Sequence, residues 1–261
     1  MSKITSILIP YDFSEAAEKG FRYAVDFAGS RPEMHLRLCF IAGEATEESL
    51  SEAFENLTRG LGKTFRAKIS WTSLIPGSVK GLLEKSLAED PDMILMGTSG
   101  SRDPEVPTKT AEIVMKAQCP VLVVPMEAPE EFSLSKIALM LGPNEIDDPS
   151  LLGNLLEICR KYRSRVTVLT IQHKPGPMGY SEEEERNEHL LKYYLESFYS
   201  HHDYIRHEDV VEAVFEYVAQ HEIEMIAILP RRHSRKGTES EGRLTRLLTL
   251  QSKTPLLALE H

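Results

Sequence analysis

Residues 7–15 read Ile-Leu-Ile-Pro-Tyr-Asp-Phe-Ser-Glu, and residues 93–100 read Met-Ile-Leu-Met-Gly-Thr-Ser-Gly. Each stretch opens with a continuous apolar run, which is typical of a strand covered on both faces of a parallel sheet. Each run then passes into glycine, acidic or hydroxyl residues, where a strand gives way to a loop. These two stretches therefore predict neighbouring parallel strands that end beside one another.

The segments between and around these runs alternate in the same way. Further strand-like runs occupy 36–41, 68–75 and 120–124, and apolar residues at helical spacing occupy 14–28, 46–66, 78–88 and 108–117. Strands separated by helices of this length predict right-handed βαβ units and an α/β fold with a parallel sheet. The expected architecture is a doubly wound, Rossmann-like domain with strand order 3-2-1-4-5.

The same alternation of strands and helices occurs twice along the chain. Ile137 follows Ile7, and Ile171 follows Ile41, by 130 residues each (137 − 7 and 171 − 41). A repeat of this length indicates a domain duplication, because solenoid periods are shorter. We expect two tandem domains, 1–127 and 134–261, joined by a linker within 126–132.

The amino acid composition excludes some classes of binding partner. The chain of 261 residues carries a net charge of −10 from 30 basic and 40 acidic side chains, which disfavours nucleic acid and an anionic membrane surface. No apolar run approaches the roughly 20 residues that cross a bilayer, and the first residues do not resemble a secretory signal. Three distant cysteines predict no disulfide framework and no thiolate metal site. These features predict a cytoplasmic protein.

A ligand site is expected where strand order reverses. In an open parallel sheet that place lies beyond the carboxyl ends of the first and fourth strands. Asp12 would there face the loop that begins at Gly97 and Gly100, and its carboxylate could accept a hydrogen bond from a sugar hydroxyl or a base amine. Ser101 and Thr108, near a helix start, could donate to phosphate. The alternative is that Asp12 only caps the following helix.

Four stretches resemble the universal stress protein family. Residues 7–15 are similar to its opening strand, 96–100 to the start of its nucleotide loop, and 110–112 with 119–125 to its last helix and strand. The resemblance covers the first half in motif and the second half in layout. It implies a stress-response protein whose two domains join through their last strands, 121–124 and 256–259, as an internal pseudo-dimer. Whether two copies of the whole chain also form a homodimer is left open by the sequence.

The resemblance also implies a nucleotide site in the first domain. It implies ATP or another adenine nucleotide as the ligand, with Mg²⁺ only as an ion bound to that nucleotide. Together with Ser101, the expected contacts are Pro10, Asp12, Ile41, Met96, Gly97, Gly100 and Thr108.

Two departures from the family pattern stand out. Six residues separate Gly100 from Pro107, where the family has nine before a third glycine, and Pro107 removes a backbone N–H. In the second half, Gly142 stands where Asp12 does, and 230–233 (Pro-Arg-Arg-His) replaces 97–100. That site is expected to lack the nucleotide pocket. Arg231, Arg232, Arg235 and Lys236 form either an anion grip or a solvated basic loop.

No other motif predicts chemistry. The chain has no nucleophile elbow, no P-loop and no assignable base–nucleophile pair, so catalysis has no positive support. His201, His202 and His207 fit a surface strand better than a metal site, because adjacent strand residues point to opposite faces. Three functions remain open: a nucleotide-responsive stress protein, a binding or scaffold module without nucleotide, and, less favoured, an ATPase or transferase.

Overall fold

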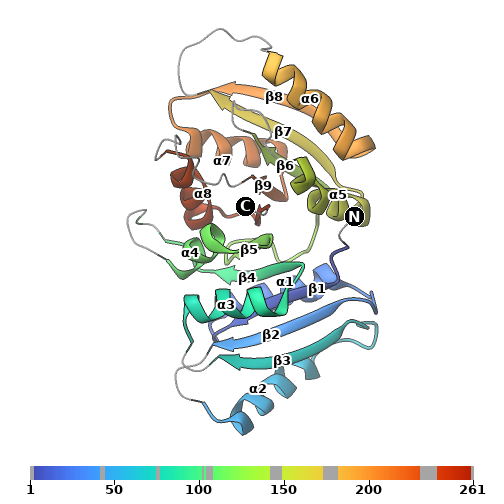
Figure 1. Ribbon diagram of the computed structural model, residues 1–261, viewed down its shortest axis with the longest axis vertical. Coiled ribbons are helices and arrows are strands. Elements are labelled where there is room, and N and C mark those ends of the chain that lie inside the picture. The colour runs from blue at the N-terminus through green and yellow to red at the C-terminus, as the bar shows by residue number, and fades with distance from the viewer. Residues whose placement is uncertain are drawn as a thin grey trace.

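The computed structural model describes residues 3–41, 45–74, 77–101, 103, 108–141, 149–172, 182–229 and 240–259. Within them, ten strands form one sheet in the order β3-β2-β1-β4-β5-β10-β9-β6-β7-β8. Figure 1 shows the strands stacked along the long axis, from β3 at one end to β8 at the other.

The strands are β1 (Ser6–Tyr11), β2 (His35–Ile41), β3 (Lys68–Leu74), β4 (Met93–Thr98), β5 (Val121–Pro125), β6 (Lys136–Met140), β7 (Arg165–Gln172), β8 (Tyr199–Arg206), β9 (Met225–Ile228) and β10 (Leu256–Ala258). The α-helices are α1 (Glu15–Ala28), α2 (Glu47–Arg59), α3 (Val79–Glu89), α4 (Lys109–Lys116), α5 (Leu152–Tyr162), α6 (Glu182–Leu195), α7 (Val210–His221) and α8 (Ser240–Gln251).

The expected strand order is confirmed in both halves. β3-β2-β1-β4-β5 is the order 3-2-1-4-5, and β8-β7-β6-β9-β10 repeats it from the other end. The neighbours within each half are parallel, whereas β5 and β10 pair antiparallel through Leu122 and Leu257. This seam joins the halves as an internal pseudo-dimer. The domain boundaries 1–127 and 134–261 stay a prediction. The chain passes from β5 to β6, the first strand of the second half, through the expected linker 126–132.

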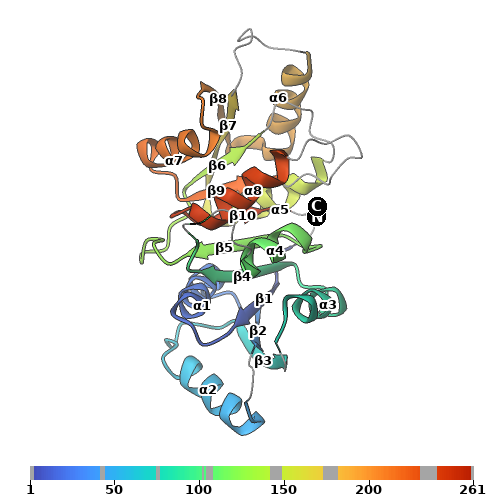
Figure 2. The same cartoon turned by 90° about the vertical axis from the view of Figure 1, so that its left-hand side faces the viewer.

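Helices cover both faces of the sheet, as a doubly wound fold requires (Figure 2). One core cluster contains Phe21 of α1 and Leu155 of α5, together with residues of α2 and α6. The other contains Val114 of α4 and Leu248 of α8, together with residues of α3 and α7. The chain thus crosses the sheet between its second and third helices in each half.

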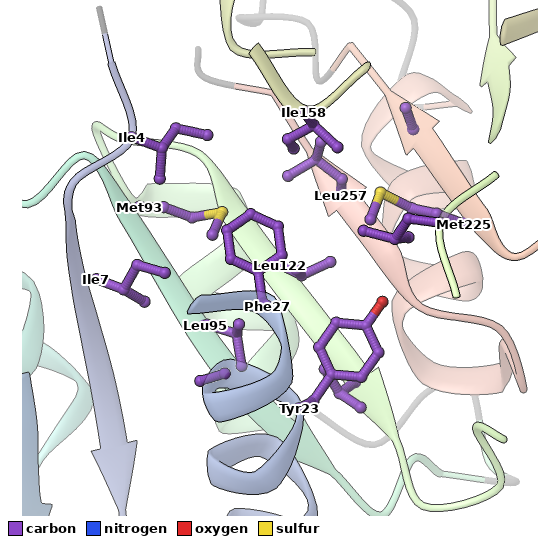
Figure 3. Packing of buried hydrophobic residues seen from close by; sticks show 14 of the residues in the cluster. Ile4, Ile7, Tyr23, Phe27, Met93, Leu95, Leu122, Ile158, Met225 and Leu257 are labelled. Carbon is purple, nitrogen blue, oxygen red and sulfur yellow. The ribbon is translucent and has the colours of Figure 1, made fainter. Parts of the chain in front are cut away.

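The first core crosses the seam. Leu122 of β5 and Leu257 of β10 lie beside each other, and Phe27 and Met225 approach from the two halves (Figure 3). All four side chains are at most 1 % exposed. Because apolar burial stabilises by roughly 25 cal/mol per Å², neither half could expose this seam to water without a large loss of stability.

Helix starts follow their sequence signals. Ser14, Thr46, Ser78 and Thr108 each accept a backbone N–H three residues further on, which satisfies one of the free donors of a helix start. The helix expected over 46–66 ends instead at Arg59. Gly60 follows directly, and the apolar spacing beyond it belongs to a connection that packs Phe65 against the core.

Candidate functional site

The carboxyl ends of β2, β1 and β4 lie together, as predicted for the switch point. Tyr11 is level with Phe40, so Asp12 and Ile41 leave their strands at the same height. β4 lies on the other side of β1. Pro10, Asp12, Ile41, Met96 and Gly97 therefore gather at one edge of the sheet.

Asp12 is exposed and organises the start of α1. Its Oδ1 accepts hydrogen bonds from the Ser14 backbone N–H at 3.2 Å and from the Ser14 hydroxyl at 2.6 Å. The Ser14 Oγ in turn accepts from the Ala17 N–H at 3.1 Å. One carboxylate oxygen thus serves the helix start, and the other has no hydrogen-bond partner among the described residues. Ser14 is therefore the N-cap of α1, and Asp12 supports it from an exposed position.

An aromatic group that the sequence analysis missed stands next to Asp12. We call Tyr11, Phe13, Phe40 and Trp71 the aromatic platform. Phe13 stacks on Phe40 with ring centroids 5.3 Å apart and planes 7° from parallel, and Tyr11 and Phe13 pack edge to face with ring centroids 5.4 Å apart. Phe13 is 49 % exposed and has a φ of 66°, which is unusual for a bulky side chain. Periodicity could not reveal this platform, because its members come from three strands and a turn.

Ile41 is covered by the connection that leads into α3. A Cβ placed on Gly77 would lie 2.0 Å from the Ile41 Cγ2. This close approach leaves Ile41 half-buried. The side chain can form an apolar wall at the site, and its other side belongs to the second core cluster.

Gly97 is required by helix packing. A Cβ there would lie 1.6 Å from the carbonyl oxygen of Ala16, and a Cβ on Gly20 would lie 2.4 Å from the Gly97 nitrogen. The first turns of α1 therefore rest directly on the backbone of β4. The Met96 side chain is 7 % exposed and belongs to the second core cluster, so only its backbone could meet a ligand.

Gly100 and Ser101 contact the other half of the molecule. The Ser101 N–H donates to the Leu250 carbonyl in the last turn of α8 at 3.0 Å, and the Gly100 N–H donates to the Thr98 hydroxyl at 3.1 Å. Carbonyls at a helix end lack partners within the helix. The two N–H groups of this loop that a phosphate would need therefore already have acceptors.

Thr108 is the N-cap of α4. Its Oγ1 accepts the Ala111 N–H at 3.2 Å, and Thr110 reaches the Thr98 hydroxyl at 3.4 Å. The predicted residue Pro107 lies outside the described residues. So do the second-half positions Gly142, 230–233, Arg235 and Lys236.

The two buried cysteines give no sign of activation. Burial raises the pKa of the Cys39 thiol to about 11 and that of the Cys159 thiol to about 12, so both stay protonated thiols. His202 of β8 contacts Thr170 and stacks on Tyr204. Across the described part of the chain, no three His, Cys, Asp or Glu side chains are grouped as a metal site requires.

Replacing Gly100 with alanine should destabilise the protein by about 2 kcal/mol, because a Cβ would lie 2.6 Å from the Leu250 carbonyl oxygen and φ is +67°. Urea unfolding measures the loss. Gly29→Ala is the matched control: its φ is +58°, but the nearest atom to its Cβ is 3.8 Å away. It should lose only the cost of its strained backbone, about 1 kcal/mol or more, and less than Gly100→Ala, which adds the steric contact. Equal losses would contradict a tight contact between the halves.

No family model matches this sequence, and no curated protein matches it. Solved structures do. A universal stress protein from Archaeoglobus fulgidus is 12 % identical with a TM-score of 0.65, covering 99 % of this chain and 97 % of that one. A putative universal stress protein from Pseudomonas aeruginosa is 16 % identical with a TM-score of 0.64, covering 98 % and 93 %.

The same fold also occurs in another setting. The cytoplasmic domain of a prokaryotic cation chloride cotransporter is 12 % identical with a TM-score of 0.57, covering 98 % of this chain and 95 % of that one. Identities this low establish architecture and leave function to the site. Since the first two of these structures align over nearly the whole chain, this protein has the tandem universal stress protein fold, with two such units in one polypeptide.

Proposed function

We propose that this chain is a universal stress protein that acts in the stress response by binding an adenine nucleotide at the carboxyl edge of its N-terminal half. The observation that carries the proposal is the pairing of an exposed carboxylate, Asp12, with the exposed ring of Phe13 at the switch point of the sheet. A carboxylate can accept from ribose hydroxyls, and aromatic faces stack on bases.

The base and ribose supply most of the affinity in this proposal. Asp12 accepts from the ribose or the base amine, Ile41 and the exposed ring of Phe13 contact the base, and the backbone at Pro10, Met96 and Gly97 forms the floor. The phosphates gain less, because Gly100 and Ser101 already donate to other acceptors. Thr108 and any nucleotide-bound Mg²⁺ stand at the phosphate end.

Calorimetry with ATP, ADP, AMP and adenosine tests this mode of binding. The four ligands should bind within about tenfold of one another, since a phosphate clamp of charge-assisted hydrogen bonds would add more than 1.4 kcal/mol. Asp12→Asn keeps an acceptor for Ser14 but removes the charge, and should weaken adenosine binding about tenfold.

Glu84→Gln is the matched control, because Glu84 is exposed on α3 and also loses one negative charge. It should leave adenosine binding unchanged. The absence of binding heat with every ligand at millimolar concentration would contradict the proposal, as would equal binding by Asp12→Asn and the wild type.

A binding or scaffold module without nucleotide is the second candidate. It is favoured by the contact of Ser101 with Leu250, which uses a loop N–H for an interaction between the halves. Mass spectrometry of gently purified protein separates the two candidates, because a co-purified nucleotide supports only the first. Among the described helices, none has the length and apolarity to cross a bilayer. A cytoplasmic location is part of the proposal.

A further inference from the structure

A cavity lies at the amino end of the sheet, opposite the candidate nucleotide site. It has a volume of about 300 Å³ and lies between the ends of α1 and α5, where the chain enters β1. Ile4, Phe27 and Ile158, which are nearly fully buried, form its apolar base between the two halves (Figure 3). Its charged lining consists of Lys3, Arg31, Glu33, Glu157, Arg160 and Lys161.

Two of these cations occupy equivalent places in the duplicated fold. Arg31 stands four residues before His35, the first residue of β2, and Lys161 stands four residues before Arg165, the first residue of β7. β2 and β7 pair in the same register with the first strand of their halves. The internal symmetry therefore brings the same position of each half to one cavity.

Arg31 and Lys161 converge on a single neutral acceptor. The Arg31 Nη2 donates to the Phe27 carbonyl at 3.3 Å, and the Lys161 Nζ donates to the same oxygen. The Tyr162 hydroxyl also donates to it. One carbonyl cannot serve three donors well, since it offers two lone pairs. Capping of the α1 end accounts for Arg31, whose Nε also donates to the Ala28 carbonyl at 3.2 Å. The ammonium of Lys161 also lies over the rings of Phe27 and Tyr162, 4.5 and 4.3 Å from their centroids, but these contacts supply no formal negative charge.

The carboxylates of the cavity are engaged by the other two cations. Glu33 lies 3.7 Å from Lys3, and Glu157 lies 3.8 Å from Arg160, which also pairs with Glu196 at 2.7 Å. Over the segments that the structure describes, neither Arg31 nor Lys161 has a carboxylate oxygen within 4.0 Å. Partly buried cations normally have an anionic partner. Counted with Glu196, which pairs with Arg160, four cations stand against three carboxylates in a protein of net charge −10.

Lys161 is the cation whose charged form the cavity disfavours most clearly. Burial, and next the charge of Arg31, lower the pKa of its ammonium group to about 6, against a smaller opposing effect of Glu33. Burial also lowers the pKa of Arg31. The charged and titratable groups around Lys161 are Lys3, Arg31, Glu33, Glu157, Arg160 and Tyr162.

We propose that this cavity binds a doubly charged oxyanion, the chemistry of a phosphate group, between Arg31 and Lys161 on the internal symmetry axis. The guanidinium of Arg31 supplies a planar pair of donors, and the ammonium of Lys161 supplies a point charge from the opposite half. The site is independent of the nucleotide site, which lies at the other end of the strands.

Binding is coupled to a proton. The pKa of Lys161 is lowered in the folded chain, so the unfolded chain holds this proton more tightly, and the stability of the empty protein rises with pH from about 6 toward the ordinary lysine pKa. An anion beside Lys161 raises its pKa again. Near pH 7.5 the bound complex therefore takes up a proton that the free protein lacks.

Inorganic phosphate is the probe. Calorimetry at pH 7.5 in two buffers of different ionisation enthalpy should show millimolar binding with net uptake of up to one proton. Phosphate at about ten times its Kd should raise Tm by about 2–4 °C. Lys161→Met should lose at least tenfold in phosphate affinity and lose the proton uptake. It should remain folded without phosphate, because a methionine of similar volume replaces a strained charge.

Three further variants complete the test. Lys80→Met changes an 86 % exposed lysine on α3 and should bind phosphate like the wild type. Arg31→Gln should weaken phosphate binding at least tenfold, and Asp12→Asn should leave it unchanged, so failure of this site and failure of the nucleotide site are distinguishable. The proposal is overturned if phosphate gives no heat and no Tm shift, or if Lys161→Met binds it with wild-type affinity.

Discussion

Gly97→Val should lower the free energy of unfolding by about 4 kcal/mol or more and unfold the N-terminal half. The first carbon of the new side chain would lie 1.6 Å from the Ala16 carbonyl oxygen, which belongs to the backbone of α1 and cannot rotate away. α1 would have to leave β4, and the buried residues Phe21 and Ala24 would leave the core with it. Losses of this size are exceptional for a single substitution and indicate a backbone clash.

Far-UV circular dichroism with urea unfolding measures the effect. Gly153→Ala is the matched control, because Gly153 lies in α5 and a Cβ there meets nothing within 4 Å. Alanine should stabilise that helix by about 0.5 kcal/mol. A folded Gly97→Val protein of wild-type stability would show that α1 does not rest on β4.

This result also changes how the nucleotide site can be tested. A loss of ligand binding in Gly97→Val would follow from unfolding alone, so it says nothing about phosphate contacts. Asp12→Asn is the better variant, since it keeps the hydrogen-bond acceptor for Ser14.

Leu257→Ala should lower the free energy of unfolding by about 3 kcal/mol, and the loss should appear in both halves. Leu257 is fully buried in β10 and pairs with Leu122 of β5 across the seam. Truncation removes apolar contacts and leaves a cavity that a close-packed seam cannot fill. The single tryptophan, Trp71, lies in β3 of the other half and provides the probe.

Urea titration followed by Trp71 fluorescence should show the transition of Leu257→Ala at lower urea, coincident with the transition seen by circular dichroism. Leu87→Ala is the control, because Leu87 is 56 % exposed on α3 and its loss should cost less than about 0.5 kcal/mol. An unchanged Trp71 transition, with a separate early loss of ellipticity, would contradict cooperative unfolding of the two halves.

Much of the fold could be predicted from particular residues. The apolar run 93–96 appears as β4 and the run 121–124 as most of β5. The separation of 130 residues, shared by Ile7 with Ile137 and by Ile41 with Ile171, indicated duplication. The strand order and the β5–β10 seam are as expected. These features depend on local periodicity and on general rules of chain connection, which a sequence displays directly.

The candidate site could be predicted only in position. Asp12, Ile41 and Gly97 do lie at one edge, but their roles depend on what stands against them. Gly97 accommodates α1, and the loop at Gly100 and Ser101 meets α8 of the other half. No spacing in the sequence shows that the Ser101 N–H is engaged by a carbonyl 149 residues away (250 − 101).

The amino acid sequence by itself determined two α/β units, their strand order and the edge of the sheet where Asp12, Ile41 and Gly97 lie together, because burial patterns repeat with the period of each strand and helix. Only the tertiary structure decided that Phe13 and Phe40 stack, and that Arg31 and Lys161 share one carbonyl. Such contacts join side chains distant along the chain, and the distances and charges between them exist only after the halves have packed.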